Sequence, residues 1–110
     1  MRRWAKVADL WRELKDLSPH PEVLAEGRIV AAGALADQGK LADALAMFQQ
    51  SLSVPKRIQP YHLKQWYVAA DLNDRAGNVL DARRLFDRIA KCDPAFADVE
   101  ERLAQIGKPR

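Results

Sequence analysis

Apolar residues recur at steps of three and four along most of this chain, a spacing typical of amphipathic helices. No segment alternates apolar and polar residues in the manner of a half-buried strand. The pattern therefore predicts an all-α protein. Six helices are expected, with approximate ranges 4–17, 21–38, 41–53, 61–76, 79–91 and 95–106.

The ends of these segments coincide with residues that interrupt helices. Pro19 and Pro21 should end the first helix, because proline cannot donate to a helical hydrogen-bond ladder. Gly39 and Gly77 follow the second and fourth helices, where glycine readily adopts the left-handed geometry of a helix exit. At residues 93–94, an aspartate followed by a proline predicts the capped start of the last helix.

One pattern repeats at a nearly constant interval. A glycine, an alanine five positions later and a phenylalanine four positions after that occur in residues 39–48 and again, 38 positions on, in residues 77–86. A degenerate copy, Val7-x3-Trp11, precedes the Ala–Phe part of the first pattern by 37 positions. Repetition in this range on a helical background indicates stacked helix pairs.

These helix pairs resemble tetratricopeptide repeats, whose pattern is W-x2-L-G-x2-Y…A-x3-F…P with a period of about 34 residues. The second pair carries the family residues Trp66, Ala70, Gly77, Ala82, Phe86 and Pro94. The first pair keeps Ala32, Gly39, Ala44 and Phe48. It departs from the family at Arg28, where tryptophan is preferred, and at Lys56, where proline is preferred. A connection about four residues longer than the family's accounts for the interval of 38.

The resemblance implies a right-handed α-α superhelix of about two and a half helix pairs, forming a single domain over residues 1–110. It divides the chain into a half repeat (1–18), two repeats (21–58 and 61–94) and a capping helix (95–107). In this family, small residues let the helices of a pair approach closely, and the first helix of each pair lines a concave face that holds a peptide or a partner helix.

The resemblance therefore predicts a non-catalytic adaptor or scaffold that binds a protein or peptide. The concave-face residues it indicates are Glu26, Ile29, Val30, Gly33, Asp37, Lys64, Tyr67, Val68, Asp71 and Arg75. Tyr67, flanked by Lys64 and Asp71, combines an aromatic side chain with both signs of charge, as binding hot spots often do.

Composition supports a helical chain and gives little reason to expect nucleic acid as a partner. Eighteen residues are alanine and none is threonine, which favours helix. Lysine and arginine total 18 against 15 acids, a net charge of only +3. Nucleic-acid binding remains the alternative function, through a basic face that would contact phosphates. Its residues would be Arg83, Arg84, Arg88 and Lys91, with Arg2, Arg3 and Lys6.

We expect a cytoplasmic protein with no membrane partner. The longest uncharged, mostly apolar run covers residues 29–36, far short of the roughly 20 residues that span a bilayer. Lys6 and Asp9 carry charge where a signal peptide would be apolar. The single cysteine, Cys92, cannot form an intramolecular disulfide, which fits a reducing compartment.

The residues indicate no catalytic, cofactor or metal site. His20 and His62 lie far apart near proline-containing segments, without a metal-ligand spacing. Cys92 follows a lysine that could lower its thiol pKa, but a structural role near a helix end is the simpler interpretation. The acid pairs Asp71/Asp74 and Glu100/Glu101 are interpreted as solvated helix faces.

The first helix leaves three interpretations open. As half of a repeat, it has no preceding helix to cover the side that bears Ala8 or Leu10. A second copy of the chain could cover this side in a homodimer, or an upstream helix of a longer protein could do so. A monomer is the third interpretation.

Overall fold

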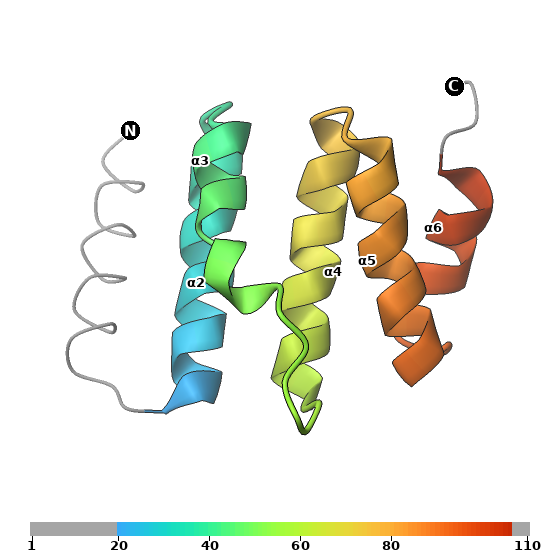
Figure 1. Ribbon diagram of the computed structural model, residues 1–110. Helices are drawn as coiled ribbons and strands as arrows, with labels where there is room; N and C mark the ends of the chain where they lie inside the picture. The colour runs from blue at the N-terminus through green and yellow to red at the C-terminus, as the bar shows by residue number, and fades with distance from the viewer. Residues whose placement is uncertain (1–19, 107–110) are drawn as a thin grey trace. The chain divides into compact units, whose positions relative to one another are not determined.

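The computed structural model describes residues 20–106, and every element in this range is helical (Figure 1). The predicted all-α class is therefore confirmed for this part of the chain. The expected first helix and half repeat, with Val7 and Trp11, lie outside the described residues. The elements are α2 (Pro21–Asp37), α3 (Leu41–Ala46), the 3-10 turn η1 (Gln49–Ser51), α4 (Pro60–Arg75), α5 (Val79–Cys92) and α6 (Val99–Gln105).

The chain divides into two compact units, Met1–Gln65 and Trp66–Arg110, and we describe each by itself. The boundary falls inside α4. The first turns of α4 belong to the first unit, and the rest of the helix belongs to the second.

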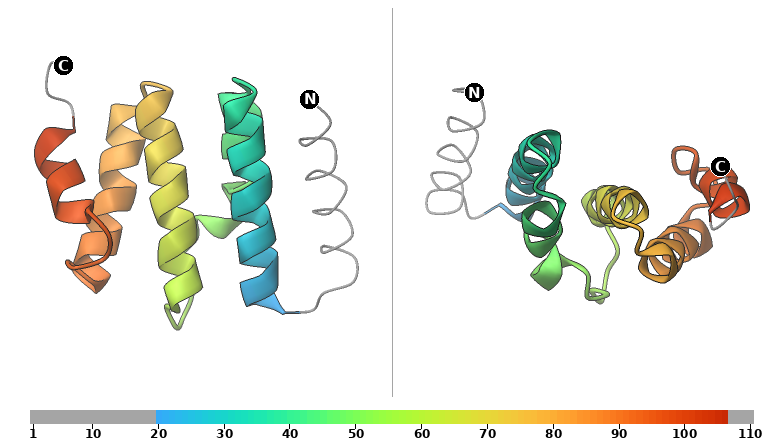
Figure 2. Two further views of the ribbon diagram at one scale, coloured as in Figure 1. Left: turned by 180° about the vertical axis from the view of Figure 1, so that it is seen from behind. Right: turned by 90° about the horizontal axis from the view of Figure 1, so that it is seen from above.

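In the first unit, α2 and α3 pack against each other as an antiparallel pair (Figures 1 and 2). The turn between them depends on Gly39, whose φ of +80° lies in the left-handed region, as predicted. The Lys40 N–H donates to the Leu35 carbonyl at 2.9 Å, the six-residue closure common after a glycine exit. Ala32 and Ala44, fully buried, lie on the two helices of this pair.

The third helix is shorter than predicted. It ends at Ala46 instead of continuing to residue 53, and the chain tightens into three-residue hydrogen bonds. The N–H groups of Phe48 and Ser51 donate to carbonyls three positions earlier, at 3.0 and 2.8 Å. The tightened segment keeps Phe48 fully buried and leads into the connection that ends at Pro60.

In the second unit, α4 and α5 contribute the core that the periodicity predicted. Its buried residues are Trp66, Ala69, Ala70, Leu72, Ala82, Leu85, Phe86 and Ile89. The turn repeats the first one, with Gly77 at a φ of +86° and the Asn78 N–H donating to the Asn73 carbonyl at 2.8 Å. The buried Asn73 amide is satisfied, since its Nδ2 donates to the Ala69 carbonyl and its Oδ1 accepts from Asn78.

The last helix begins four residues later than predicted, at Val99. Asp93 does not cap it; its carboxylate accepts the N–H of Ala95 at 3.1 Å in a local turn. Ala97 then has a φ of +47°, a left-handed conformation that a helix cannot include. The helix therefore starts after this residue and packs against α5, with Val99 fully buried (Figure 2).

We expect Phe86→Ala to lower the free energy of unfolding by about 3–5 kcal/mol, because it leaves a cavity in a packed core. The measurement is urea denaturation followed by circular dichroism. Leu80→Ala is the matched control on the same helix: this side chain is 67% exposed, so its removal should change the value by less than about 0.5 kcal/mol. Equal losses from both variants would contradict the packing described.

Candidate functional site

The residues expected on one binding face fall into two sets. Glu26, Ile29, Val30, Asp37 and Lys64 belong to the first unit, together with Gly33. Tyr67, Val68, Asp71 and Arg75 belong to the second. The two sets differ in what their side chains contact.

The first set lies mainly on one face of α2. Residues 22, 23, 26, 30, 33 and 37 fall within about 100° of each other around the helix, given 3.6 residues per turn. Val30 is 57% exposed and Val23 is 40% exposed, so two aliphatic side chains two turns apart face solvent. Ile29, at the edge of this stripe, is half-buried. We call the six positions the α2 face.

The charges of α2 that face solvent are all acidic. Glu22, Glu26 and Asp37 are exposed. Arg28 instead points to the first turns of α4, where its guanidinium donates to the Gln65 side-chain oxygen, and burial lowers its pKa from the ordinary value. The α2 face is thus apolar and anionic.

Lys64 lies beside this face. Its ammonium is 3.1 Å from the Glu26 carboxylate, and both side chains are more than half exposed. An exposed pair of this kind contributes about 0–1 kcal/mol, so a competing partner could open it at little cost. The sequence predicted both residues for one face, and the structure brings them together.

Tyr67, the expected hot spot, makes intramolecular contacts instead of facing solvent freely. Its hydroxyl donates to the Asp98 carboxylate, just before α6. Its ring packs edge-on against Phe86 and Phe96, with centroid distances of 5.6 and 6.1 Å. These contacts fasten α6 and the preceding turn to α4 and α5.

Arg102 of α6 organises the charged residues of the second set. Its Nη2 donates to Asp71 at 2.9 Å and to Asp74 at 3.3 Å, while Arg75 approaches Asp71 at 2.9 Å. Its guanidinium also lies 4.8 Å from the centre of the Phe86 ring. Asp71 and Asp74 are therefore half-buried members of an ion-pair network, and not the solvated pair that the sequence suggested.

This environment shifts two pKa values. Burial acts to lower the pKa of Arg102, but the hydrogen bond and charge attraction to Asp71, joined by Tyr67, outweigh it and raise the pKa. Burial raises the pKa of Tyr67, and the bond to Asp98 raises it further, because a phenolate beside a carboxylate is disfavoured. Both shifts favour the protonated forms seen in the network.

Sequence reasoning did not single out Arg102. A signal for it was available: Asp71 and Asp74, three positions apart, share a face of α4, and Arg102 is the one cation of the segment predicted to cap that repeat.

The basic residues proposed for nucleic acid have partners within the chain. Arg84 and Lys91 lie 3.9 and 3.0 Å from Asp81 and Asp87 on the same helix. Arg83 donates to the Ile106 carbonyl at 3.2 Å, and Arg88 lies over the Trp66 ring at 5.0 Å. The other expected members, Arg2, Arg3 and Lys6, lie outside the described residues.

The described range contains no cluster of three or more His, Cys, Asp or Glu side chains suited to a metal ion. Cys92 is an exposed free thiol at the end of α5, and His20 is exposed before α2. Within residues 20–106 no helix is long and apolar enough to cross a bilayer.

Comparisons with family models, with curated proteins and with solved structures found no match for this chain.

We expect Tyr67 to ionise above the ordinary tyrosine value of 10.0. A Tyr61→Phe background leaves it the only tyrosine, so ultraviolet absorbance of the phenolate reports it alone. Asp98→Asn removes the neighbouring negative charge and should lower the pKa. The pKa of Tyr67 is higher in the folded state than in the unfolded state. The contact therefore contributes its full stability below the unfolded-state pKa, and this contribution is lost as the pH rises through the folded-state pKa. An unchanged titration in Asp98→Asn would contradict the assigned contact.

Proposed function

We propose that this protein is a non-catalytic interaction module built of tetratricopeptide-like helix pairs, and that the α2 face binds a peptide or helix of a protein partner. The observation that carries the proposal is the exposure of Val23 and Val30 on one helix face among acidic side chains. Aliphatic side chains exposed together on one helix face are a common feature of protein-binding surfaces.

The packing of both helix pairs supports the tetratricopeptide-like part of the proposal. The small positions of the pattern are fully buried in both pairs, and so are the two phenylalanines. Each pair turns at a glycine with positive φ and closes with the same six-residue hydrogen bond. The residues concerned are Ala32, Ala44, Ala70, Ala82, Phe48 and Phe86.

The chemistry of the face indicates the partner's side chains. Val23 and Val30 are about 10 Å apart along α2, two turns of helix, which matches aliphatic residues spaced i and i+7 on a partner helix. Glu22, Glu26 and Asp37 favour lysine or arginine beside those aliphatic positions. We therefore propose an amphipathic segment that is apolar and basic.

The second unit has a supporting role in this proposal. Tyr67 and Asp71 fasten α6 through Asp98 and Arg102, so their side chains stabilise the module from within. Val68 and Arg75, half-buried and exposed respectively, remain open to further contacts.

We expect Val30→Asp to weaken partner binding at least tenfold, about 1.4 kcal/mol. The substitution replaces an exposed apolar side chain of the α2 face by a charged carboxylate, which would lose the apolar contact with the partner. Partners would first be captured from a lysate with the wild-type chain. The recombinant partner would then be titrated calorimetrically against the wild-type chain and the variants.

Leu80→Asp is the matched control, since it makes the same change at an exposed position of α5 in the other unit. It should leave the affinity unchanged, and circular dichroism should show both variants equally helical. Equal affinity of Val30→Asp and the wild-type chain for every captured partner would refute binding through the α2 face.

A further inference from the structure

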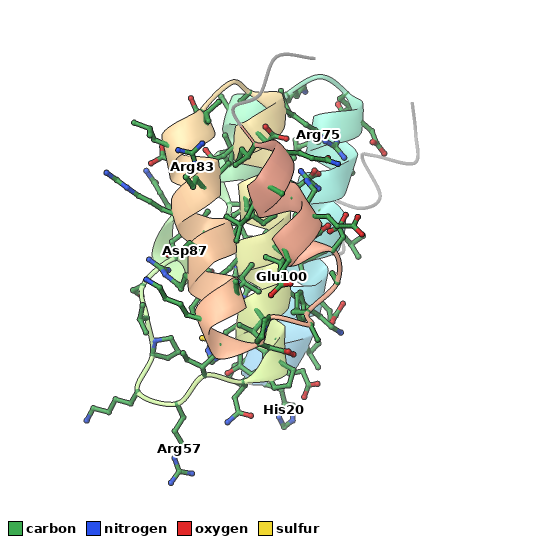
Figure 3. All side chains as sticks on the ribbon, turned by 90° about the vertical axis from the view of Figure 1, so that its right-hand side faces the viewer. His20, Arg57, Arg75, Arg83, Asp87 and Glu100 are labelled. Atoms are coloured by element: carbon green, nitrogen blue, oxygen red, sulfur yellow. The ribbon has the colours of Figure 1, made fainter. Side chains whose placement is uncertain are left out.

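The connection between η1 and α4 presents a second exposed apolar and charged surface in the first unit. Val54 is 59% exposed and Ile58 is 39% exposed, and Lys56 and Arg57 between them are exposed as well. Arg57 extends away from the helices (Figure 3). We call residues 54–58 the basic connection.

The charge of the basic connection is opposite to that of the α2 face. No aspartate or glutamate occurs between Asp43 and Asp71 in the sequence, so this segment carries two cations and no acid. The α2 face exposes Glu22, Glu26 and Asp37. Each surface also exposes two aliphatic side chains, so the two surfaces are complementary in charge and alike in apolar character.

The spacing of the aliphatic side chains fits as well. Val23 and Val30 are about 10 Å apart along α2. Val54 and Ile58 lie in a segment that is not helical, where four residues span at most about 14 Å, so these two side chains can cover the same distance. Prolines within and just after the segment restrict its backbone, which lowers the entropy lost when it docks.

The two surfaces of one copy face different directions. The α2 face lies on the side of the helix opposite Ala25 and Ala32, which are buried. Seen from above, α2 and the connection that leads to α4 lie on opposite sides of α3 (Figure 2, right). An α2 face and a basic connection therefore meet when they belong to different copies of the chain.

We propose that this protein binds a second copy of itself head to tail, with the basic connection of one copy docked on the α2 face of the next. The aliphatic side chains of the two surfaces pack together, and Lys56 and Arg57 approach the carboxylates of the α2 face. The inference rests on the proposed function and names the partner of the same face. A head-to-tail contact leaves one surface of each kind unused at the ends, so association can continue past the dimer.

The test is analytical ultracentrifugation of the full chain at concentrations up to about 1 mM, at which contacts with a dissociation constant of that order are populated. We expect the weight-average mass of the wild-type chain to rise with concentration and to fall as salt is added, because salt screens exposed charges. A mass equal to that of the monomer at every concentration would overturn the proposal.

Variants of each surface identify the contact. Val30→Asp and, separately, Lys56→Gln/Arg57→Gln should each lower the association constant at least fivefold. Arg84→Gln/Lys91→Gln removes the same charge from α5, in the other unit, and should change the constant less than twofold. Equal weakening by the two double variants would mean that net charge, and not the basic connection, controls association.

A mixing experiment tests the head-to-tail arrangement directly. Val30→Asp keeps its basic connection, and Lys56→Glu/Arg57→Glu keeps its α2 face. Each variant alone should be monomeric, whereas their mixture should form a heterodimer that grows no further, because only one complementary pair of surfaces remains. Association of Lys56→Glu/Arg57→Glu by itself, or a mixture that stays monomeric although circular dichroism shows both variants folded, would refute the arrangement.

The results also separate this inference from the proposed function. A chain that does not associate with itself, but whose Val30→Asp variant loses a captured partner, has a binding site on the α2 face for a different protein. Self-association that Val30→Asp leaves unchanged would contradict the second copy as the occupant of the α2 face, and the captured partners would then decide the proposed function alone.

Discussion

Close approach between the helices of each pair is the constraint on which the described structure depends. Alanine occupies fully buried positions on both helices of each pair, where a small side chain leaves room for close packing. Close packing in turn requires tight reversals, and glycine provides the positive φ at residues 39 and 77. The helices then present their remaining faces in fixed directions, which is how α2 exposes two valines while burying the alanines opposite.

The two units use charge differently. In the first, the ion pair between Glu26 and Lys64 is exposed to solvent. In the second, Arg102 is half-buried among two carboxylates and an aromatic ring, where ion pairs are less screened by solvent. The second unit therefore uses charge to hold its last helix, whereas the exposed pair of the first unit contributes little to stability.

The sequence predicted the helical class, the glycine turns and most of the core, because these follow from periodicity and from local backbone preferences. It missed the early end of α3 and the late start of α6. Both boundaries depend on local backbone conformation: the three-residue hydrogen bonds around Phe48 end α3, and the left-handed Ala97 delays α6. The spacing of apolar residues carries no information about either. The sequence paired Glu26 and Lys64 on one face through the repeat. It did not connect Arg102 and Asp98 with Asp71 and Tyr67, because these contacts depend on where α6 begins, after the left-handed Ala97.

The boundary between the units has a consequence for how this chain can vary. Gln65 lines a small pocket of the first unit and Trp66 is buried in the second unit's core, although they are neighbours in α4. Inserting one residue between them would rotate Gln65 by about 100° relative to Trp66. We therefore expect insertions and deletions to be tolerated in the connection before Pro60 and not within α4, because Gln65 and Trp66 must keep their relative orientation on this helix.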